Sequence, residues 1–417
     1  MPVTSEQVPA MPHAPAAGRA FTLVVRAWLV IGAALATGVL MLVGYVAAGR
    51  WARVLPRPTA ASAVSHPYDG LPWFGQYRRE FESSLGMHWS PYVYWQRRPF
   101  AGAQINVDSL GFRRTIQAHG GGEQTRQLWF FGGSTMWGTW QRDSMTIPSA
   151  VARGLAQQGI RDVEVRNFGE SGYVFTQELL RLILQLRAGQ VPSVVVFYNG
   201  ANDLAASTMN PSCGLPQNEQ RREFEFSLGR LLQNQGSREL SEFARVFKNF
   251  LENRANAALV ANGRAQPPQL DVNRAVRETI GCYTGTVQVV EALASAYGFR
   301  VLYFWQPMPG ASPKSLTPYE RAQFIPDVRN GTREFLEPLA RTAYASIDSA
   351  MVPLVGDRYH NIAATFAGDS SAVWIDFVGH ITESATQKVV TGMLPPIARA
   401  LTPSPSVPNA VTATQKD

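Results

Sequence analysis

Four short segments of this chain place residues suited to serine-dependent acyl chemistry directly after apolar runs. Attack by a serine needs a base for the hydroxyl proton, a group that orients the base, and donors facing the developing oxyanion. The first segment is FFGGST, in which Gly133 precedes Ser134. Its glycines allow a sharp turn, after which Ser134 would open a helix whose N-terminus favours negative charge. The same segment also fits an ordinary strand-to-helix turn with Ser134 as N-cap.

Two further segments contain candidate oxyanion donors. The segment NFGESGY includes Gly172, whose backbone N–H is one candidate, although these letters also suit a plain glycine-rich turn. The segment YNGANDL follows the most apolar run of the domain and includes Gly200. There Asn202 would aim its side-chain amide at the same point, and Asp203 would brace the loop. The alternative for this segment is an Asx turn.

The fourth segment, WIDFVGH, supplies a base and a carboxylate from one short loop, His380 and Asp376. A lone histidine at this place would more often be a helix-start or surface residue. The other five histidines are less well placed, because they precede the first core strand, lie in its leading loop or fall in an irregular stretch: His13, His66, His88, His119 and His360. No Cys/His cluster has the spacing of metal ligands, so neither a metal nor another cofactor is expected.

Strand and helix patterns alternate through the second half of the chain. Apolar runs predict strands at 127–131, 163–168, 193–198, 300–305 and 373–377. Helical spacing predicts helices at 146–158, 176–188, 286–297, 334–351 and 382–401. This alternation predicts an α/β fold, a three-layer α/β/α sandwich with a central parallel sheet. Ligands bind such sheets at the carboxyl ends of the strands, where each of the four segments lies.

An uncharged apolar segment near the start, at residues 27–48, has the roughly 20-residue length of a membrane-spanning helix. It predicts one transmembrane helix after a Pro/Ala-rich, disordered leader at 1–26; a cleaved signal peptide is the alternative. Arginines flank both ends, so charge alone does not set the orientation. The further divisions are a linker and wrap segment at 49–126, a domain at 127–401 with an insertion at about 205–283, and a flexible tail at 402–417.

Composition indicates a folded protein and excludes several partners. Of 417 residues, 45% are hydrophobic and 17% charged, and the net charge is +7. The basic residues are scattered without a dense run, so no nucleic-acid partner is expected. The two cysteines, Cys213 and Cys282, lie near the ends of the insertion. A disulfide between them would contribute roughly 4 kcal/mol in the chain-entropy model; two free buried thiols are the alternative.

Together, the four segments resemble the SGNH (GDSL-like) hydrolase family, over residues 127–401 without the insertion. The resemblance implies the flavodoxin-like fold of that family and a serine nucleophile, Ser134. It also implies an oxyanion hole formed by the N–H groups of Ser134 and Gly172 and the side chain of Asn202. His380 would be the general base, oriented by Asp376, with Gly133, Gly200 and Asp203 in support.

The sequence departs from the family pattern in two places. The first segment reads Gly-Gly-Ser-Thr where the family name implies Gly-Asp-Ser, a position at which many relatives vary. The family usually spaces its acid three residues before the histidine, whereas Asp376 lies four before His380. Gly379 is the apparent extra residue and would absorb the insertion in a tight turn. Otherwise His380 would work with a backbone carbonyl, leaving a Ser–His dyad.

The segment at 106–113 and the predicted anchor are similar to a bacterial, membrane-attached branch of the family that acts in the cell envelope. This implies a single-pass inner-membrane protein with an extracytoplasmic domain that hydrolyses O-acyl (acetyl) esters of carbohydrate, or another small ester. Two alternatives stay open, an O-acetyltransferase of polysaccharide and a non-catalytic glycan-binding assembly protein. The aromatic-rich segment Trp89–Phe100 would line an acyl groove in a lipase, although surface packing explains these residues as well.

Overall fold

The computed structural model describes residues 65–117, 125–210, 212–234, 236–261, 271–324 and 333–402. The predicted leader at 1–26, the predicted transmembrane helix at 27–48 and nearly all of the predicted tail lie outside these residues. Among the helices that the structure describes, none combines the length and the apolar character needed to cross a bilayer.

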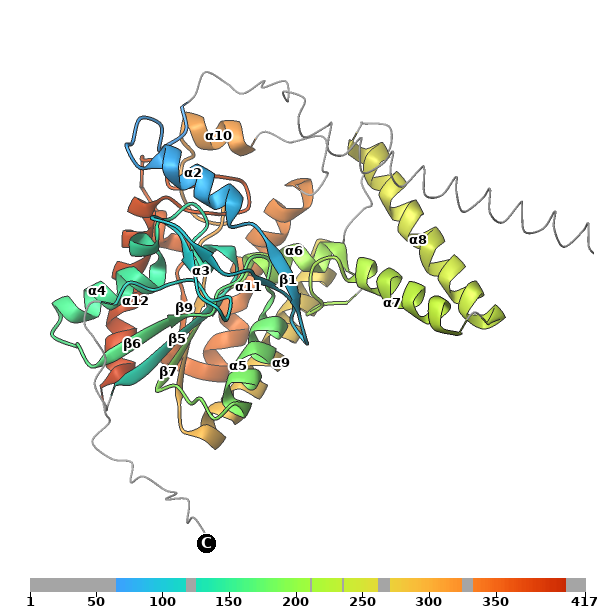
Figure 1. Cartoon of the computed structure of the whole chain (residues 1–417). Helices are drawn as coiled ribbons and strands as arrows, with labels where there is room; N and C mark the ends of the chain where they lie inside the picture. The colour runs from blue at the N-terminus through green and yellow to red at the C-terminus, as the bar shows by residue number, and fades with distance from the viewer. Residues whose placement is uncertain are drawn as a thin grey trace, which may run out of the picture. The chain divides into compact units, whose positions relative to one another are not determined.

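Five parallel strands form the central sheet, in the order β6-β5-β7-β8-β9 (Figure 1). Their bounds are Arg126–Gly132 for β5, Val163–Asn167 for β6, Val194–Asn199 for β7, Arg300–Trp305 for β8 and Tyr359–Asn361 for β9. The prediction of an α/β fold around a parallel sheet is confirmed. Renumbered within the sheet, the order is 2-1-3-4-5, that of flavodoxin-like folds. In such folds ligands bind where the strand order reverses, which here is between β5 and β7.

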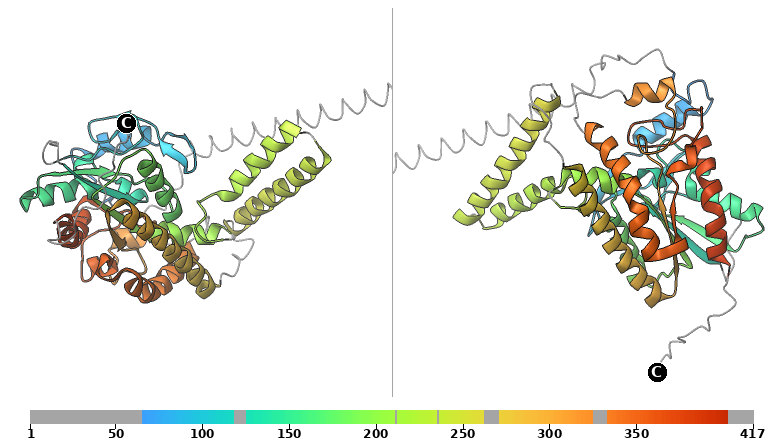
Figure 2. Two further views of the ribbon diagram at one scale, coloured as in Figure 1. Left: turned by 90° about the horizontal axis from the view of Figure 1, so that it is seen from below. Right: turned by 180° about the vertical axis from the view of Figure 1, so that it is seen from behind.

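Side chains of β5 alternate between two apolar cores, one on each face of the sheet. Leu128 and Phe130 pack in the core with helices α4 (Ile147–Gln157) and α12 (Glu383–Leu401). Trp129 and Phe131 pack in the opposite core, whose helices are α5 (Phe175–Arg187), α9 (Val272–Tyr297) and α11 (Arg333–Val355). Because the sheet is covered on both faces, its strands read as continuous apolar runs. The three layers are visible from two sides in Figure 2.

The fifth strand is not where the sequence predicted it. Residues 373–377 form a loop with one isolated bridge, Trp374 to Ile381, and the fifth strand of the sheet is β9. The N–H groups of Val373 and Trp374 both donate to a carboxylate oxygen of Glu320, at 2.9 Å each. A side chain has therefore taken the hydrogen bonds that a neighbouring strand would have made.

The segment before β5 contains regular elements that the sequence pattern did not reveal. These are helix α2 (Phe74–Ser83) and two small antiparallel pairs, β1 (Met87–Ser90) with β2 (Tyr94–Arg97) and β3 (Phe100–Ala101) with β4 (Asn106–Val107). Tyr77 and Ile105 are fully buried in a third apolar cluster. That cluster also contains Trp137, three residues after Ser134, so this segment packs directly against the candidate site.

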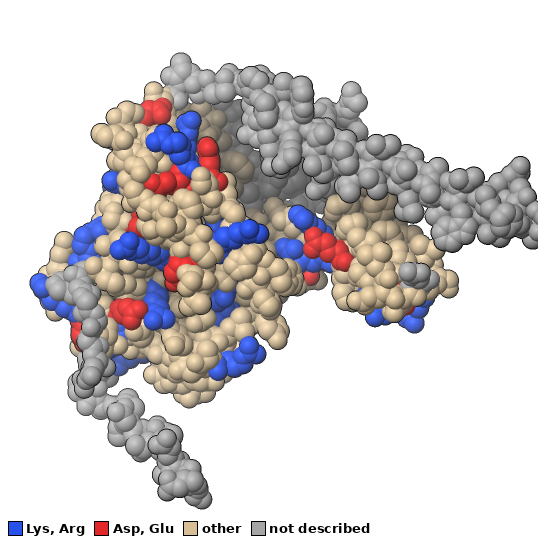
Figure 3. Space-filling model, in the orientation of Figure 1, with Lys and Arg blue, Asp and Glu red and all other residues tan. Residues whose placement is uncertain are grey.

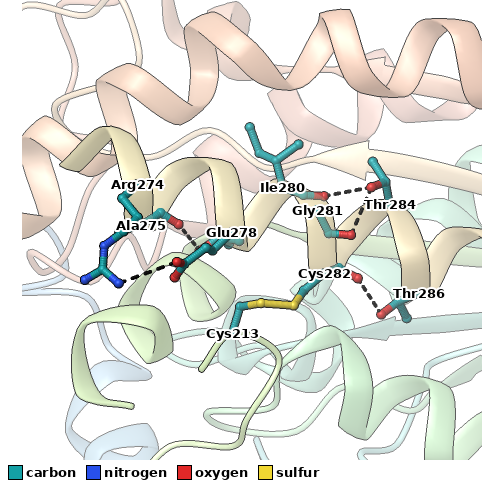
Figure 4. The surroundings of a disulfide bond; sticks show 10 residues. Cys213, Arg274, Ala275, Glu278, Ile280, Gly281, Cys282, Thr284 and Thr286 are labelled. Carbon is teal, nitrogen blue, oxygen red and sulfur yellow. Dashed lines mark hydrogen bonds and ion pairs between the residues drawn. A yellow bond between two sulfur atoms is a disulfide. The ribbon is translucent and has the colours of Figure 1, made fainter. Parts of the chain in front are cut away.

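The insertion after β7 is helical and is closed by a disulfide. It contains α6 (Ala201–Met209), α7 (Glu219–Asn234) and α8 (Ser237–Ala261), and the short helix α10 (Pro318–Phe324) follows β8. Rings of Phe224 and Phe250 stack between α7 and α8, with centroids 5.1 Å apart. Cys213, after α6, is bonded to Cys282 of α9 (Figure 4). Both cysteines of the chain are thus in a disulfide, rather than free.

We expect this disulfide to stabilise the domain measurably. It spans 69 residues of sequence, and a closed loop of that length contributes roughly 4 kcal/mol by restricting the unfolded chain. The Cys213→Ser/Cys282→Ser double variant should therefore unfold at lower urea concentration than the wild type. Reduction should lower the wild-type midpoint to that of the variant and leave the variant unchanged. Equal midpoints for the oxidised wild type and the variant would contradict the expectation.

Candidate active site

Ser134 is the first residue of a one-turn helix, α3 (Ser134–Trp137), which begins where β5 ends. Gly133 connects the two elements and lies in close contact with Asn202. A Cβ atom on Gly133 would stand 2.1 Å from the side-chain nitrogen of Asn202, so any larger residue would displace that amide. The glycine therefore brings the amide of Asn202 against the backbone that leads into Ser134.

His380 bridges Ser134 and Asp376. Its Nε2 lies 2.7 Å from Ser134 Oγ, and its Nδ1 lies 2.6 Å from Asp376 Oδ2. A neutral imidazole facing a carboxylate at Nδ1 holds its proton there, which leaves the Nε2 lone pair for the serine hydroxyl. The backbone N–H of His380 also donates to Asp376 Oδ1, at 3.2 Å. The same carboxylate thus fixes both the ring and the backbone of the histidine.

The four-residue spacing between Asp376 and His380 is accommodated in a tight turn. Gly379 has φ +92°, a conformation that other residues rarely adopt. Its N–H donates to the carbonyl of Asp376 at 3.3 Å, and the N–H of Ile375 donates to the carbonyl of His380 at 2.9 Å. The extra residue is thereby folded away from the contact between the carboxylate and the ring, which is a side-chain contact and not one to a backbone carbonyl.

The Asp376 carboxylate is kept ionised by its partners. Burial acts to raise the pKa of Asp376, but His380 and the indole N–H of Trp140 outweigh it and hold the pKa below its usual value. The indole Nε1 of Trp140 donates to Asp376 Oδ2 at 3.0 Å. An ionised carboxylate at this position orients the imidazole and stabilises the imidazolium that forms when the ring takes a proton.

The candidate oxyanion donors follow three neighbouring strands. Ser134 follows β5, Gly172 follows β6 and Asn202 follows β7. The N–H of Glu170 donates to the carbonyl of Gly132 at 3.0 Å and so fastens the loop after β6 to the end of β5. Asn202 Nδ2 donates one proton to the carbonyl of Tyr173 at 2.7 Å. An amide nitrogen carries two protons, so the second is free to face an oxyanion near Gly133.

Two carboxyl groups hold the junction between β7 and α6, where Asn202 lies in the first turn of the helix. Asp203 Oδ1 accepts the N–H of Phe175 at 3.0 Å, and burial raises the pKa of Asp203 to about 6. Glu178 Oε2 accepts the side-chain amide of Asn199 at 2.7 Å, directly before Gly200. Burial, followed by the nearby charge of Asp203, raises the pKa of Glu178 well above its usual value. Both carboxyl groups thus connect the junction between β7 and α6 to the first turn of α5.

The single helical turn that begins at Ser134 is held at its other end by contacts to Trp137. The guanidinium groups of Arg97 and Arg113 lie 4.3 and 4.2 Å from the ring of Trp137. Each arginine is paired with a buried carboxylate, Arg97 with Glu170 at 3.4 Å and Arg113 with Asp143 at 2.6 Å. Since both arginines belong to the segment before β5, that segment is part of the framework of the site.

Two residues that support the site were not predicted from the sequence. Trp140 contacts Asp376, and Glu320 holds the loop before it while forming a buried ion pair with Lys314 at 2.7 Å. Neither lies in the four segments, and no pattern of spacing singles them out. Among the described residues, no group of three or more His, Cys, Asp or Glu side chains is arranged to hold a metal ion.

Comparisons with known proteins return structural similarity only. No protein-family description matches the sequence, and no curated protein matches it. Among solved structures, TesA is 16% identical and covers 66% of this chain and 100% of its own, at a TM-score of 0.34. The acetyl xylan esterase AlAXEase is 13% identical, covering 64% and 97%, at 0.33. A lipase/acylhydrolase from Enterococcus faecalis is 16% identical, covering 68% and 100%, at 0.35. Similarities at these values do not show what the chain does.

Proposed function

We propose that this protein is a serine-dependent carboxylic ester hydrolase that works through an acyl-enzyme. The observation that carries the proposal is the continuous contact from Ser134 Oγ through the His380 ring to the Asp376 carboxylate, at 2.7 and 2.6 Å. A nucleophile and a base within hydrogen-bond reach, with the base held by a third group, are the arrangement that activates a serine hydroxyl. The SGNH-like order of the four sequence segments supports the same assignment.

In this mechanism Ser134 Oγ attacks the ester carbonyl carbon while His380 Nε2 takes the hydroxyl proton. The oxyanion of the tetrahedral intermediate is stabilised by the free amide proton of Asn202 and the N–H groups of Ser134 and Gly172. His380 then gives its proton to the departing alcohol, leaving the acyl group on Ser134. A water molecule, deprotonated by His380, attacks the acyl-enzyme and releases the carboxylic acid, which restores the hydroxyl of Ser134.

We further propose that the substrates are O-acyl, chiefly acetyl, esters of cell-envelope carbohydrate, and that the domain works outside the cytoplasm on a membrane anchor. The uncharged segment at 27–48 and the envelope-type sequence at 106–113 support this setting. The disulfide between Cys213 and Cys282 also supports it, because disulfides persist in oxidising compartments. On the face in Figure 3, Lys and Arg side chains lie scattered among uncharged residues, with some Asp and Glu between them.

Replacement of Ser134 by alanine should abolish ester hydrolysis. Loss of a serine nucleophile lowers kcat by on the order of 10⁶ in a serine hydrolase, because no acyl-enzyme can form. The rate of p-nitrophenol release from p-nitrophenyl acetate measures this loss. The exposed Ser349→Ala variant is the matched control and should keep the wild-type rate. Equal rates in Ser134→Ala and the wild type, with both folded by circular dichroism, would remove Ser134 as the nucleophile.

Trp140→Phe should lower kcat while leaving KM nearly unchanged. The substitution keeps an aromatic ring but removes the N–H that donates to Asp376 Oδ2. A hydrogen bond to a charged group is worth about 1.5–3 kcal/mol, which corresponds to roughly a 10- to 100-fold fall in rate when the bond supports the transition state. Steady-state kinetics on p-nitrophenyl acetate separate the two constants. An unchanged kcat would show that His380 alone orients the carboxylate.

A further inference from the structure

An aromatic surface on the β1–β2 hairpin lies next to the candidate oxyanion hole. Trp89 and Trp95 are directly opposite each other in the antiparallel register, so their side chains share one face of the hairpin. Trp89 is 61% exposed, and its ring lies 5.5 Å from that of Tyr94. We call Trp89, Tyr94 and Trp95 the aromatic shelf. A tryptophan this exposed contributes little to a core, and most of its ring is open to a ligand.

The aromatic shelf is continuous with the loop that carries Gly172. The indole N–H of Trp95 donates to the carbonyl of Ser171 at 2.8 Å, and the hydroxyl of Tyr173 donates to the carbonyl of Trp95 at 2.6 Å. A Cβ atom on Gly172 would lie 3.5 Å from the Trp95 ring. The face of the hairpin that carries Trp89 is therefore also the face that contacts the loop carrying Gly172.

Polar side chains of the α7 region border the same surface. The guanidinium of Arg222 lies 4.6 Å from the ring of Tyr94 and 5.1 Å from that of Trp95. The hydroxyl of Tyr94 lies 3.5 Å from a carboxylate oxygen of Glu219. Gln217 approaches Gly172 from this side, its amide oxygen 3.5 Å from where a Cβ would be. Aromatic faces and hydrogen-bonding groups thus occur together.

The hairpin backbone is also strained where it presents these rings. Tyr92 and Tyr94 have φ values of +68° and +72°, in the left-handed region that non-glycine residues rarely adopt. Strain of this kind collects at ligand sites. The conformation turns Tyr94 so that its ring meets Trp89 although the two residues are not paired across the hairpin.

We propose that the aromatic shelf binds a sugar ring in the alcohol part of the ester, which places the neighbouring acyl group at Ser134. The proposal rests on the proposed hydrolase function and adds the subsite that selects the substrate. One face of a pyranose ring presents C–H groups, which pack on the electron-rich face of an aromatic ring. Its hydroxyls need donors and acceptors at the edge, which Arg222, Glu219 and Gln217 supply. An acyl chain would gain nothing from these polar groups and would desolvate them.

The test compares Trp89→Ala with the wild type on two kinds of ester. On a panel of chemically O-acetylated tetrasaccharides, including acetylated xylotetraose and acetylated cellotetraose, KM should rise about tenfold in the variant, the effect of losing one stacking contact. On p-nitrophenyl acetate, which has no sugar ring, both constants should stay unchanged. Trp89 is exposed, so the variant should fold normally, as its unfolding midpoint will show.

Tyr297→Ala is the matched control, because Tyr297 is an aromatic residue 45% exposed at the end of α9, just before β8 begins. It therefore lies at the amino-terminal ends of the parallel strands, whereas the candidate site lies at their carboxyl ends. It should leave every constant unchanged. Kinetics of Trp89→Ala equal to the wild type on every tetrasaccharide would overturn the proposal. A loss on p-nitrophenyl octanoate instead would also overturn it, since that result identifies an acyl site.

A measurement of tetrasaccharide binding tests the sugar subsite independently of the proposed hydrolase function. Tryptophan fluorescence of Ser134→Ala should report binding of the acetylated tetrasaccharides, about tenfold weaker when Trp89→Ala is added. If the wild type hydrolyses no ester yet this difference is found, the hydrolase function fails and the sugar subsite stands. If the wild type hydrolyses p-nitrophenyl acetate but the difference is absent, the hydrolase function stands and the sugar subsite fails.

Discussion

A single turn of helix carries Ser134, the proposed nucleophile, and a helix this short cannot hold its position by its own hydrogen bonds. The contact of the Trp137 ring with two guanidinium groups is the interaction that fixes it. Arg97 and Arg113 are each neutralised by a buried carboxylate, so the positive charges reinforce the ring contact without leaving an unpaired charge in the interior. The segment before the sheet therefore holds the helical turn that carries Ser134, although it contributes no candidate catalytic atom.

His380 and Asp376, the proposed base and acid, are held in place by different contacts. Their loop takes the place of a strand, and its backbone hydrogen bonds go to the Glu320 carboxylate and to the loop's own turn. Glu320 is itself fully buried and paired with Lys314. A loop anchored by a side chain can follow a path that a sheet register forbids. This freedom permits one extra residue between Asp376 and His380 while the carboxylate still meets the ring.

The parts of the structure that were predictable from the sequence are those that follow from local patterns. Four of the five core strands were found because burial on both faces makes a strand uniformly apolar, and the four functional segments lay at their ends or in the loop before α12. The fifth strand was misplaced because VWIDF has strand-like residues, but its first two N–H groups donate to Glu320, more than fifty residues away in sequence. The contact of Trp140 with Asp376 spans 236 residues and has no local signal either. Contacts of this kind depend on how distant loops meet, which spacing along the chain does not encode.

The proposed nucleophile and the proposed base lie far apart along the chain. Ser134 and His380 are separated by 246 residues, with four strands of the central sheet and the whole helical insertion between them. A polypeptide grows from its N-terminus, so the serine and its strand are made long before the histidine exists. A nascent or truncated chain ending before residue 380 carries Ser134 without His380, its proposed proton acceptor. In the proposed mechanism, the site can therefore act only after the last part of the domain has been made and has folded.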